Sequence, residues 1–108
     1  MRAKSVVPRE QARRDIEAAI DYYADHAGEA VALRFVEALE SALRMVGTRA
    51  ATGSPQYGRE LEIRGLRHRR LKRFPFLLLY IERADHIDLW RLLHAQRDIP
   101  TLMRVPDA

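Results

Sequence analysis

The chain has no cysteine, a single tryptophan and no apolar run near the ~20 residues that a membrane-spanning helix needs. The missing cysteines exclude disulfides and thiolate metal sites. Arg2 and Lys4 open the chain, but no apolar core of ~7–15 residues follows them, so no secretory signal peptide is predicted. These absences predict a cytoplasmic protein that does not enter a membrane, and the length predicts one domain over residues 1–108.

Several signatures of catalysis are also missing. The five glycines are scattered rather than gathered in a phosphate-binding loop, and no serine lies in a nucleophile-elbow context. No histidine pair with metal-binding spacing occurs, and no group of carboxylates has a histidine beside it. The sequence therefore predicts neither a metal site nor a cofactor.

Positive charge is concentrated in the C-terminal part. Residues 1–63 hold 9 Lys/Arg and 10 Asp/Glu, whereas residues 64–108 hold 10 Lys/Arg and 5 Asp/Glu. Most of the surplus lies in the stretch RGLRHRRLKRFPFLLLYIE, which begins at Arg64. Such a run favours a nucleic acid or an acidic protein segment as partner, and the arginine fork suits phosphate and carboxylate equally well. The alternative is a basic surface that only keeps a small protein soluble.

Helical periodicity dominates the N-terminal half. Apolar residues recur at three- and four-residue spacing over 10–27, and Pro8 suits the first turn of this helix. Gly28 is expected to take the left-handed conformation after the helix end. A second helix is predicted over about 29–46, apolar on so much of its circumference that we expect cover on more than one side. Residues 47–58 are predicted to form a loop.

Strand patterns dominate the remainder. A short edge strand is predicted over 2–7, and three more over about 66–73, 76–83 and 87–95. The segment 76–81 is apolar at every position, which predicts a central strand covered on both faces. The order β-α-α-β-β-β predicts an α+β domain, with a helical hairpin on one face of a small, mainly antiparallel sheet.

The basic run and the last predicted strand supply the candidate binding residues. Alternate side chains of a strand face opposite sides, so one face of the run must approach the helices. Arginines on that face are expected to find carboxylates on the helices or to lie near the sheet edge, because an unpaired buried charge is costly. The other face would be an exposed cationic surface. The candidates for binding a partner or target are Arg67, Arg69, Arg70, Lys72, Arg73, Arg91, His94 and Arg97.

His94 is the candidate for proton transfer. It lies three residues after Arg91 and three before Arg97. An imidazole beside guanidinium groups could act as general acid or base in phosphodiester cleavage. The alternative is that His94 only hydrogen-bonds a backbone carbonyl at the end of a strand. The remaining histidines, expected in solvent or in turns, are His26, His68 and His86.

Several of these features occur together in one known family. They are the segment 8–15 that leads into the first helix, Tyr22-Tyr23, Phe35, the basic run with Phe74-Pro75-Phe76, and the ending Arg91-Leu-Leu-His94-x-x-Arg97-Asp98. Over nearly its whole length the chain resembles the ParE/RelE toxin superfamily, and most closely its ParE-like, plasmid-stabilisation branch. The predicted order of elements agrees with the fold of that family.

The resemblance implies the toxin of a type II toxin–antitoxin pair. A cognate ParD-like antitoxin would neutralise it, through a partly disordered acidic segment that folds across the toxin surface. ParE-like members are generally regarded as inhibitors of DNA gyrase, whereas RelE-like members are mRNA endonucleases that act on the ribosome.

The tail bears on this choice. RelE-like nucleases rely on basic strand residues and on a tyrosine or histidine near the C-terminal end, and the tail after Asp98 has neither. Gyrase inhibition without catalysis is therefore favoured. The alternatives are a ribosome-dependent nuclease that contacts nucleic acid, and a degenerate toxin that only binds antitoxin. For the nuclease, the catalytic candidates are Arg69, Arg70, Lys72, Arg91 and His94.

Overall fold

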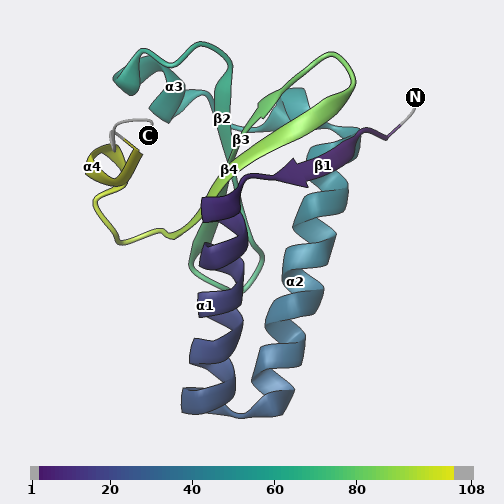
Figure 1. Ribbon diagram of the computed structural model, residues 1–108, viewed down its shortest axis with the longest axis vertical. Helices are drawn as coiled ribbons and strands as arrows, with labels where there is room; N and C mark the ends of the chain where they lie inside the picture. The colour runs from purple at the N-terminus through teal and green to yellow at the C-terminus, as the bar shows by residue number, and fades with distance from the viewer. Residues whose placement is uncertain (1–2, 104–108) are drawn as a thin grey trace.

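The computed structural model describes residues 3–103 and confirms the α+β class (Figure 1). The elements are β1 (Ser5–Pro8), α1 (Glu10–Ala27), α2 (Glu29–Thr48), the short 3₁₀ turn η1 (Ala50–Thr52), α3 (Gln56–Leu61), β2 (Leu66–Arg70), β3 (Phe76–Glu82), β4 (His86–His94) and α4 (Ile99–Met103). The helical hairpin and the three C-terminal strands lie where their patterns predict them. No helix in residues 3–103 has the length and apolar character to cross a membrane.

Four strands form one sheet in the order β1-β4-β3-β2. β1 runs parallel to β4, while the β2–β3 and β3–β4 pairs are antiparallel. β3 is an inner strand, and its residues from Leu77 to Ile81 are all buried. The predictions of a mainly antiparallel sheet and of a central apolar strand are therefore confirmed.

Each face of β3 lies in a separate core. Leu78 and Tyr80 belong to the core under α1 and α2, where Phe35 and Val46 are fully buried. Leu77, Leu79 and Ile81 belong to a second core, with Ile99 and Met103 of α4. Because alternate residues of a strand point to opposite faces, a strand between two cores must be apolar throughout.

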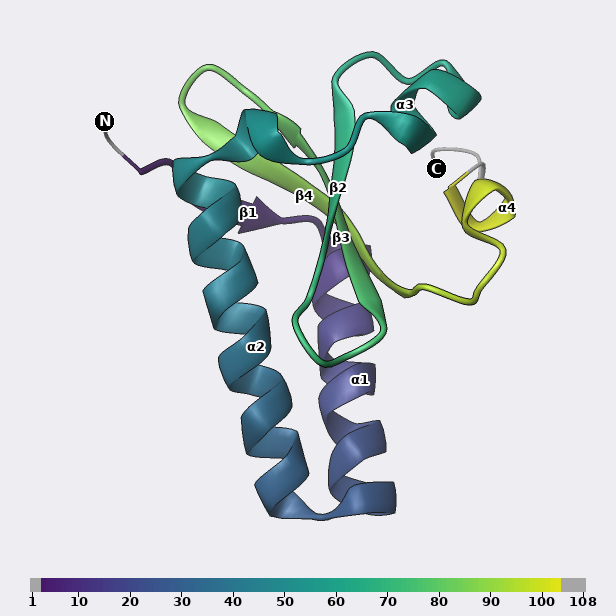
Figure 2. The same ribbon diagram turned by 180° about the vertical axis from the view of Figure 1, so that it is seen from behind.

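The hairpin covers one face of the sheet and extends beyond it (Figures 1 and 2). Gly28 joins the two helices with φ 93 and ψ 166, a positive-φ conformation that suits glycine but is not the left-handed helical one we predicted. Leu33, near the start of α2, is 58% exposed. The rest of α2 contacts both α1 and the sheet strands β1, β2 and β4, so the expectation that α2 is covered on more than one side is confirmed.

Three boundaries also differ from the prediction. Pro8 ends β1 and Arg9 caps α1, so the proline is not in the first helical turn. β2 stops at Arg70 rather than residue 73, and Arg73 has φ 68, which no regular strand contains. The predicted loop contains η1 and the start of α3. Of the predicted first strand, residue 2 lies outside the described range.

Candidate functional site

Part of the basic run forms the edge strand β2, and two of its arginines are held by the loop that precedes this strand. Arg67 and Arg69 pair with Tyr80 and Leu78, so they lie on the hairpin side of the sheet. Arg67 Nη1 donates to the Gly53 carbonyl oxygen at 2.8 Å, and Arg69 Nη2 donates to the Thr52 hydroxyl. Within residues 3–103 neither arginine pairs with a carboxylate on the helices; each bonds a neutral oxygen instead. Both lie at the edge of the sheet, which was the other location expected for them.

His68 lies on the opposite side of β2 and is half-buried. Its ring packs against Tyr57 of α3, with the ring centroids 5.0 Å apart. Burial lowers the pKa of His68 below its usual value of 6.5, which keeps the imidazole neutral at pH 7. The prediction that His68 is a solvent or turn residue is therefore wrong. The sequence did contain a signal for this position. His68 follows Leu66 by two residues in a predicted strand, so the two side chains share one face of the sheet, and Leu66 is buried.

Lys72 and Arg73 lie in the turn between β2 and β3, not on a strand. Both are exposed, and they line a groove of about 470 Å³ against α2, with Phe74 and Ala38 as its apolar part. Arg34, Glu37 and Ser41 complete the lining. Within residues 3–103 the three cations of this groove form no ion pair, so they remain available to an acidic partner.

Arg91 is committed to an internal ion pair. Its Nε and Nη2 atoms donate to the two carboxylate oxygens of Asp15 on α1 at 2.7 and 3.0 Å. The same carboxylate accepts the Leu92 backbone N–H at 3.1 Å. Only 17% of the Arg91 side chain and 11% of the Asp15 side chain is exposed. Arg91, which lies outside the basic run, therefore ties β4 to α1 through a helix carboxylate.

His94 and Arg97 lie at the end of β4. The His94 ring contacts Phe76 with the ring centroids 5.3 Å apart, and its Nδ1 accepts the Gln96 backbone N–H at 3.1 Å. Since Nδ1 is the acceptor, the neutral ring carries its proton on Nε2. The structural alternative for His94 was a hydrogen bond to a backbone carbonyl. In the structure its partner is instead a backbone N–H. Arg97 is exposed in the turn that follows.

The residues proposed for nuclease chemistry do not converge on one site. Arg69 and Arg70 are adjacent on β2 and face opposite sides of the sheet. β3 separates them from Arg91 and His94 on β4, and two strand spacings amount to roughly 10 Å between backbones. Lys72 lies in the groove beside α2. In residues 3–103 there is no group of three metal-ligating side chains.

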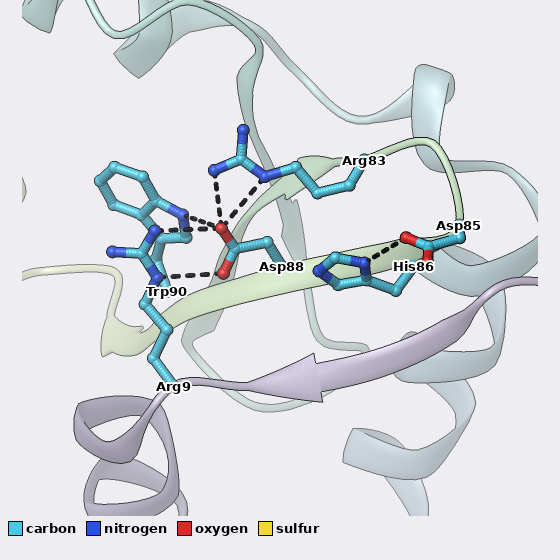
Figure 3. Close-up of polar contacts among 6 residues, drawn as sticks. All are labelled: Arg9, Arg83, Asp85, His86, Asp88 and Trp90. Carbon is cyan, nitrogen blue, oxygen red and sulfur yellow. Dashed lines mark hydrogen bonds and ion pairs between the residues drawn. The ribbon is translucent and has the colours of Figure 1, made fainter.

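A partly buried carboxylate on the inner strand β4 was missed by the sequence patterns (Figure 3). Asp88 of β4 receives Arg9 Nε and Nη2, both at 3.0 Å, and Arg83 Nη2 at 2.8 Å. Trp90 Nε1 also donates to Asp88 at 3.1 Å, and the Arg9 guanidinium lies 4.0 Å from the Trp90 ring centroid. An isolated Asp between apolar strand residues was the only available signal, since a buried carboxylate needs partners.

The acidity of Asp88 follows from these contacts. Burial alone would raise the pKa of Asp88, but the hydrogen bonds from Arg9, Arg83 and Trp90 outweigh it and lower the pKa to about 2. The carboxylate joins the start of α1 to both strands of the β3–β4 hairpin (Figure 3). This geometry is that of a structural ion-pair network, not of an acid–base catalyst.

The molecule is a small α+β domain, with a helical hairpin on one face of its sheet and a cationic strand at one edge. A sequence profile of the family described as "ParE toxin of type II toxin-antitoxin system, parDE" matches residues 6–99. The chain belongs to this family of toxins, as the resemblance implied.

A solved structure has the same fold. It is described as the chromosomal ParDE TA system from P. aeruginosa, and its similar chain is 23% identical with a TM-score of 0.72. The superposition covers 87% of this chain and 98% of that one. Among curated proteins no significant match to the chain is found.

Proposed function

We propose that this member of the ParE family acts as a toxin that inhibits DNA gyrase by binding, and that a ParD-like antitoxin neutralises it. The observation that carries a binding mechanism is the engagement of Arg91 and His94 within the fold. Arg91 is neutralised by Asp15, and His94 Nδ1 already accepts a backbone N–H. Neither side chain is set to stabilise a phosphorane or to take a proton. Gyrase acts on chromosomal DNA, so the proposed site of action is the cytoplasm.

A nuclease would require a convergent site. Proton transfer needs the base within about 3 Å of the reacting hydroxyl, and charge stabilisation needs donors aimed at the same phosphate. Arg69 and Arg70, the nuclease candidates on β2, lie roughly 10 Å across the sheet from β4. These separations favour a protein that binds over one that cuts.

The groove between α2 and the β2–β3 turn is the proposed antitoxin site. Three cations that form no ion pair within residues 3–103, Arg34, Lys72 and Arg73, surround an apolar strip of Ala38 and Phe74. Leu33 lies one helical turn before Glu37 of the groove and is exposed. An amphipathic acidic segment would pair its carboxylates with the cations and bury its apolar side chains on this strip.

Antitoxin binding can be tested with charge reversal. Replacing both Lys72 and Arg73 with glutamate should weaken the complex with the cognate antitoxin by at least about tenfold, since two charge-assisted contacts become repulsive. The matched control reverses Arg13 and Arg14 on α1, which are exposed and lie outside the groove lining. Isothermal titration calorimetry measures both. Equal losses in the two variants would show that only net charge matters and would remove the groove from the proposal.

Toxicity separates the three functions. Expression of the chain without antitoxin should stop growth, induce the DNA-damage response and cause filamentation, and coexpressed antitoxin should reverse all three. Growth arrest with cleaved mRNA and no DNA damage would favour the ribosome-dependent nuclease. Normal growth, together with a tight antitoxin complex, would favour the degenerate toxin.

A further inference from the structure

A hollow of about 320 Å³ lies beside the outer edge of β2, where the loop after η1 leaves the strand. It is lined by Thr52, Gly53, Ser54, His68, Arg69 and Arg70. Figure 2 shows the chain between η1 and α3 passing next to this strand. The pairing of Ser54 with His68, by two backbone hydrogen bonds of 2.9 Å, covers the edge up to that point.

The edge is open immediately afterwards. His68 N–H faces the loop and Leu71 N–H faces β3, so alternation directs the backbone N–H of Arg70 outward at the hollow. Arg69 and Arg70 add two guanidinium groups, and Thr52 and Ser54 add two hydroxyls. Nη2 of Arg69 is already held by Thr52, which limits its freedom. Among the described residues no carboxylate lines the hollow, in contrast to the groove beside α2, which contains Glu37.

Two buried atoms at this place have no partner in the described chain. They are Nε of Arg69 and Nδ1 of His68. Buried polar atoms are nearly always hydrogen-bonded, so each unpaired one calls for an explanation. The Arg69 Nε–H has no acceptor within residues 3–103, and it would meet an incoming oxyanion only after the groups that cover it move.

A second cationic hollow of about 200 Å³ continues along the same strand. Arg59, Arg64 and Arg67 lie in its lining, which has no carboxylate from residues 3–103. Arg67 and Arg70 are three residues apart, which is about 10 Å along an extended strand. One nucleic acid strand carries a phosphate per ~3.4 Å of helix axis, so this length spans about three phosphates.

We propose that the β2 edge, with Arg69 and Arg70 at its centre, binds the phosphate backbone of a nucleic acid. An acidic peptide that added a strand to this edge would need a run of free backbone groups, but Ser54 occupies the position opposite His68. Separate hollows rich in arginine suit successive phosphates instead, because each guanidinium can bind phosphate oxygens in a bidentate manner. This proposal goes beyond gyrase inhibition and does not depend on which target the toxin has.

The test is fluorescence anisotropy of the purified chain with a labelled DNA duplex of about 20 base pairs, measured from about 50 to 200 mM salt. Arg70→Gln removes an exposed cation and should reduce the slope of log K against log salt by about 0.9. R69Q/R70Q should reduce the slope by about 1.8 and weaken binding at low salt at least tenfold. Arg14→Gln on α1 has the same charge change and should leave the slope within error.

Three results would overturn the proposal. The first is no binding of duplex or single-stranded DNA by the wild-type chain at about 50 mM salt. The second is an equal change of slope for R70Q and R14Q, which would mean that only net charge acts. The third is that an oligoglutamate peptide binds and loses affinity in R70Q while DNA does not, which would assign the edge to an acidic protein segment. Circular dichroism of R70Q guards against a folding defect, since the Arg70 side chain is exposed and makes no hydrogen bond or ion pair within residues 3–103.

Discussion

Replacing Asp88 with asparagine tests the ion-pair network at the start of α1. The amide can accept a hydrogen bond but carries no charge, so Arg9 and Arg83 lose their common carboxylate. A carboxyl with a pKa of about 2 in the fold and 3.8 in the unfolded chain contributes about 2 kcal/mol of stability at neutral pH. Asp88→Asn should therefore lower the free energy of unfolding at pH 7 by about 2 kcal/mol.

The stability contribution of Asp88 should depend on pH in a defined direction. Because the folded pKa of Asp88 is below the unfolded one, its contribution is fully present above about pH 4 to 5 and disappears as the pH falls towards 2. The wild-type and Asp88→Asn unfolding curves should thus differ most at neutral pH and converge in acid. Urea denaturation followed by circular dichroism measures both proteins over this range. Asp21→Asn, on the exposed side of α1, is the control and should change little.

A stability difference that stays constant with pH, or a variant as stable as wild type at pH 7, would refute this reasoning. The first result would mean that the amide, not the lost charge, causes the change. The second would mean that solvation of Arg9 and Arg83, whose side chains are 40% and 44% exposed, replaces the network without cost.

Two further predictions concern the core. Gly53→Ala should destabilise the fold by about 2 kcal/mol in urea denaturation, because the added Cβ would lie 2.1 Å from the Tyr80 hydroxyl. In a Tyr80→Phe background the same change should cost less, and strictly additive losses would contradict the clash. Asp15→Ala should cost about 3 kcal/mol, since it leaves Arg91 buried without its partner. A D15L/R91M double variant should recover much of this stability, and no recovery would show that the carboxylate acts mainly through Leu92.

The helical hairpin and the inner position of β3 could be predicted because their signals are local and strong. The periodicity over α1 indicates a helix with one buried face. The apolar residue at every position of 76–81 indicates a strand buried on both faces. The edges of the elements were less certain. Residues 71–73 continue the basic pattern of β2, yet the chain turns there because Phe74 packs into the hairpin core, against Tyr23 and Phe35.

The bulge in β4 explains why the last strand could not be resolved from alternation. Strict alternation places Leu89, Arg91 and Leu93 on one face. The register shifts between Leu79 and Tyr80, and Trp90 becomes the extra residue on β4. Leu89 and Leu92 consequently share the hairpin core, whereas Leu93 lies in the second one.

The partners of the charged residues depend on contacts between distant parts of the chain. Asp15 and Arg91 are 76 residues apart, and Arg9 and Asp88 are 79 residues apart. No local pattern shows such pairs. The sequence therefore identified the cationic residues but not which are neutralised within the fold, and this distinction separates a binding surface from a catalytic one.

The most direct test of the central claim, that the toxin acts by binding gyrase rather than by cleavage, is a gyrase cleavage assay with relaxed plasmid. The wild-type chain should inhibit supercoiling and trap linear DNA after denaturation of gyrase, and His94→Ala should retain this activity. A purified chain that leaves gyrase unaffected at any excess, but cuts mRNA in the ribosomal A site and loses that cleavage in His94→Ala, would contradict the account.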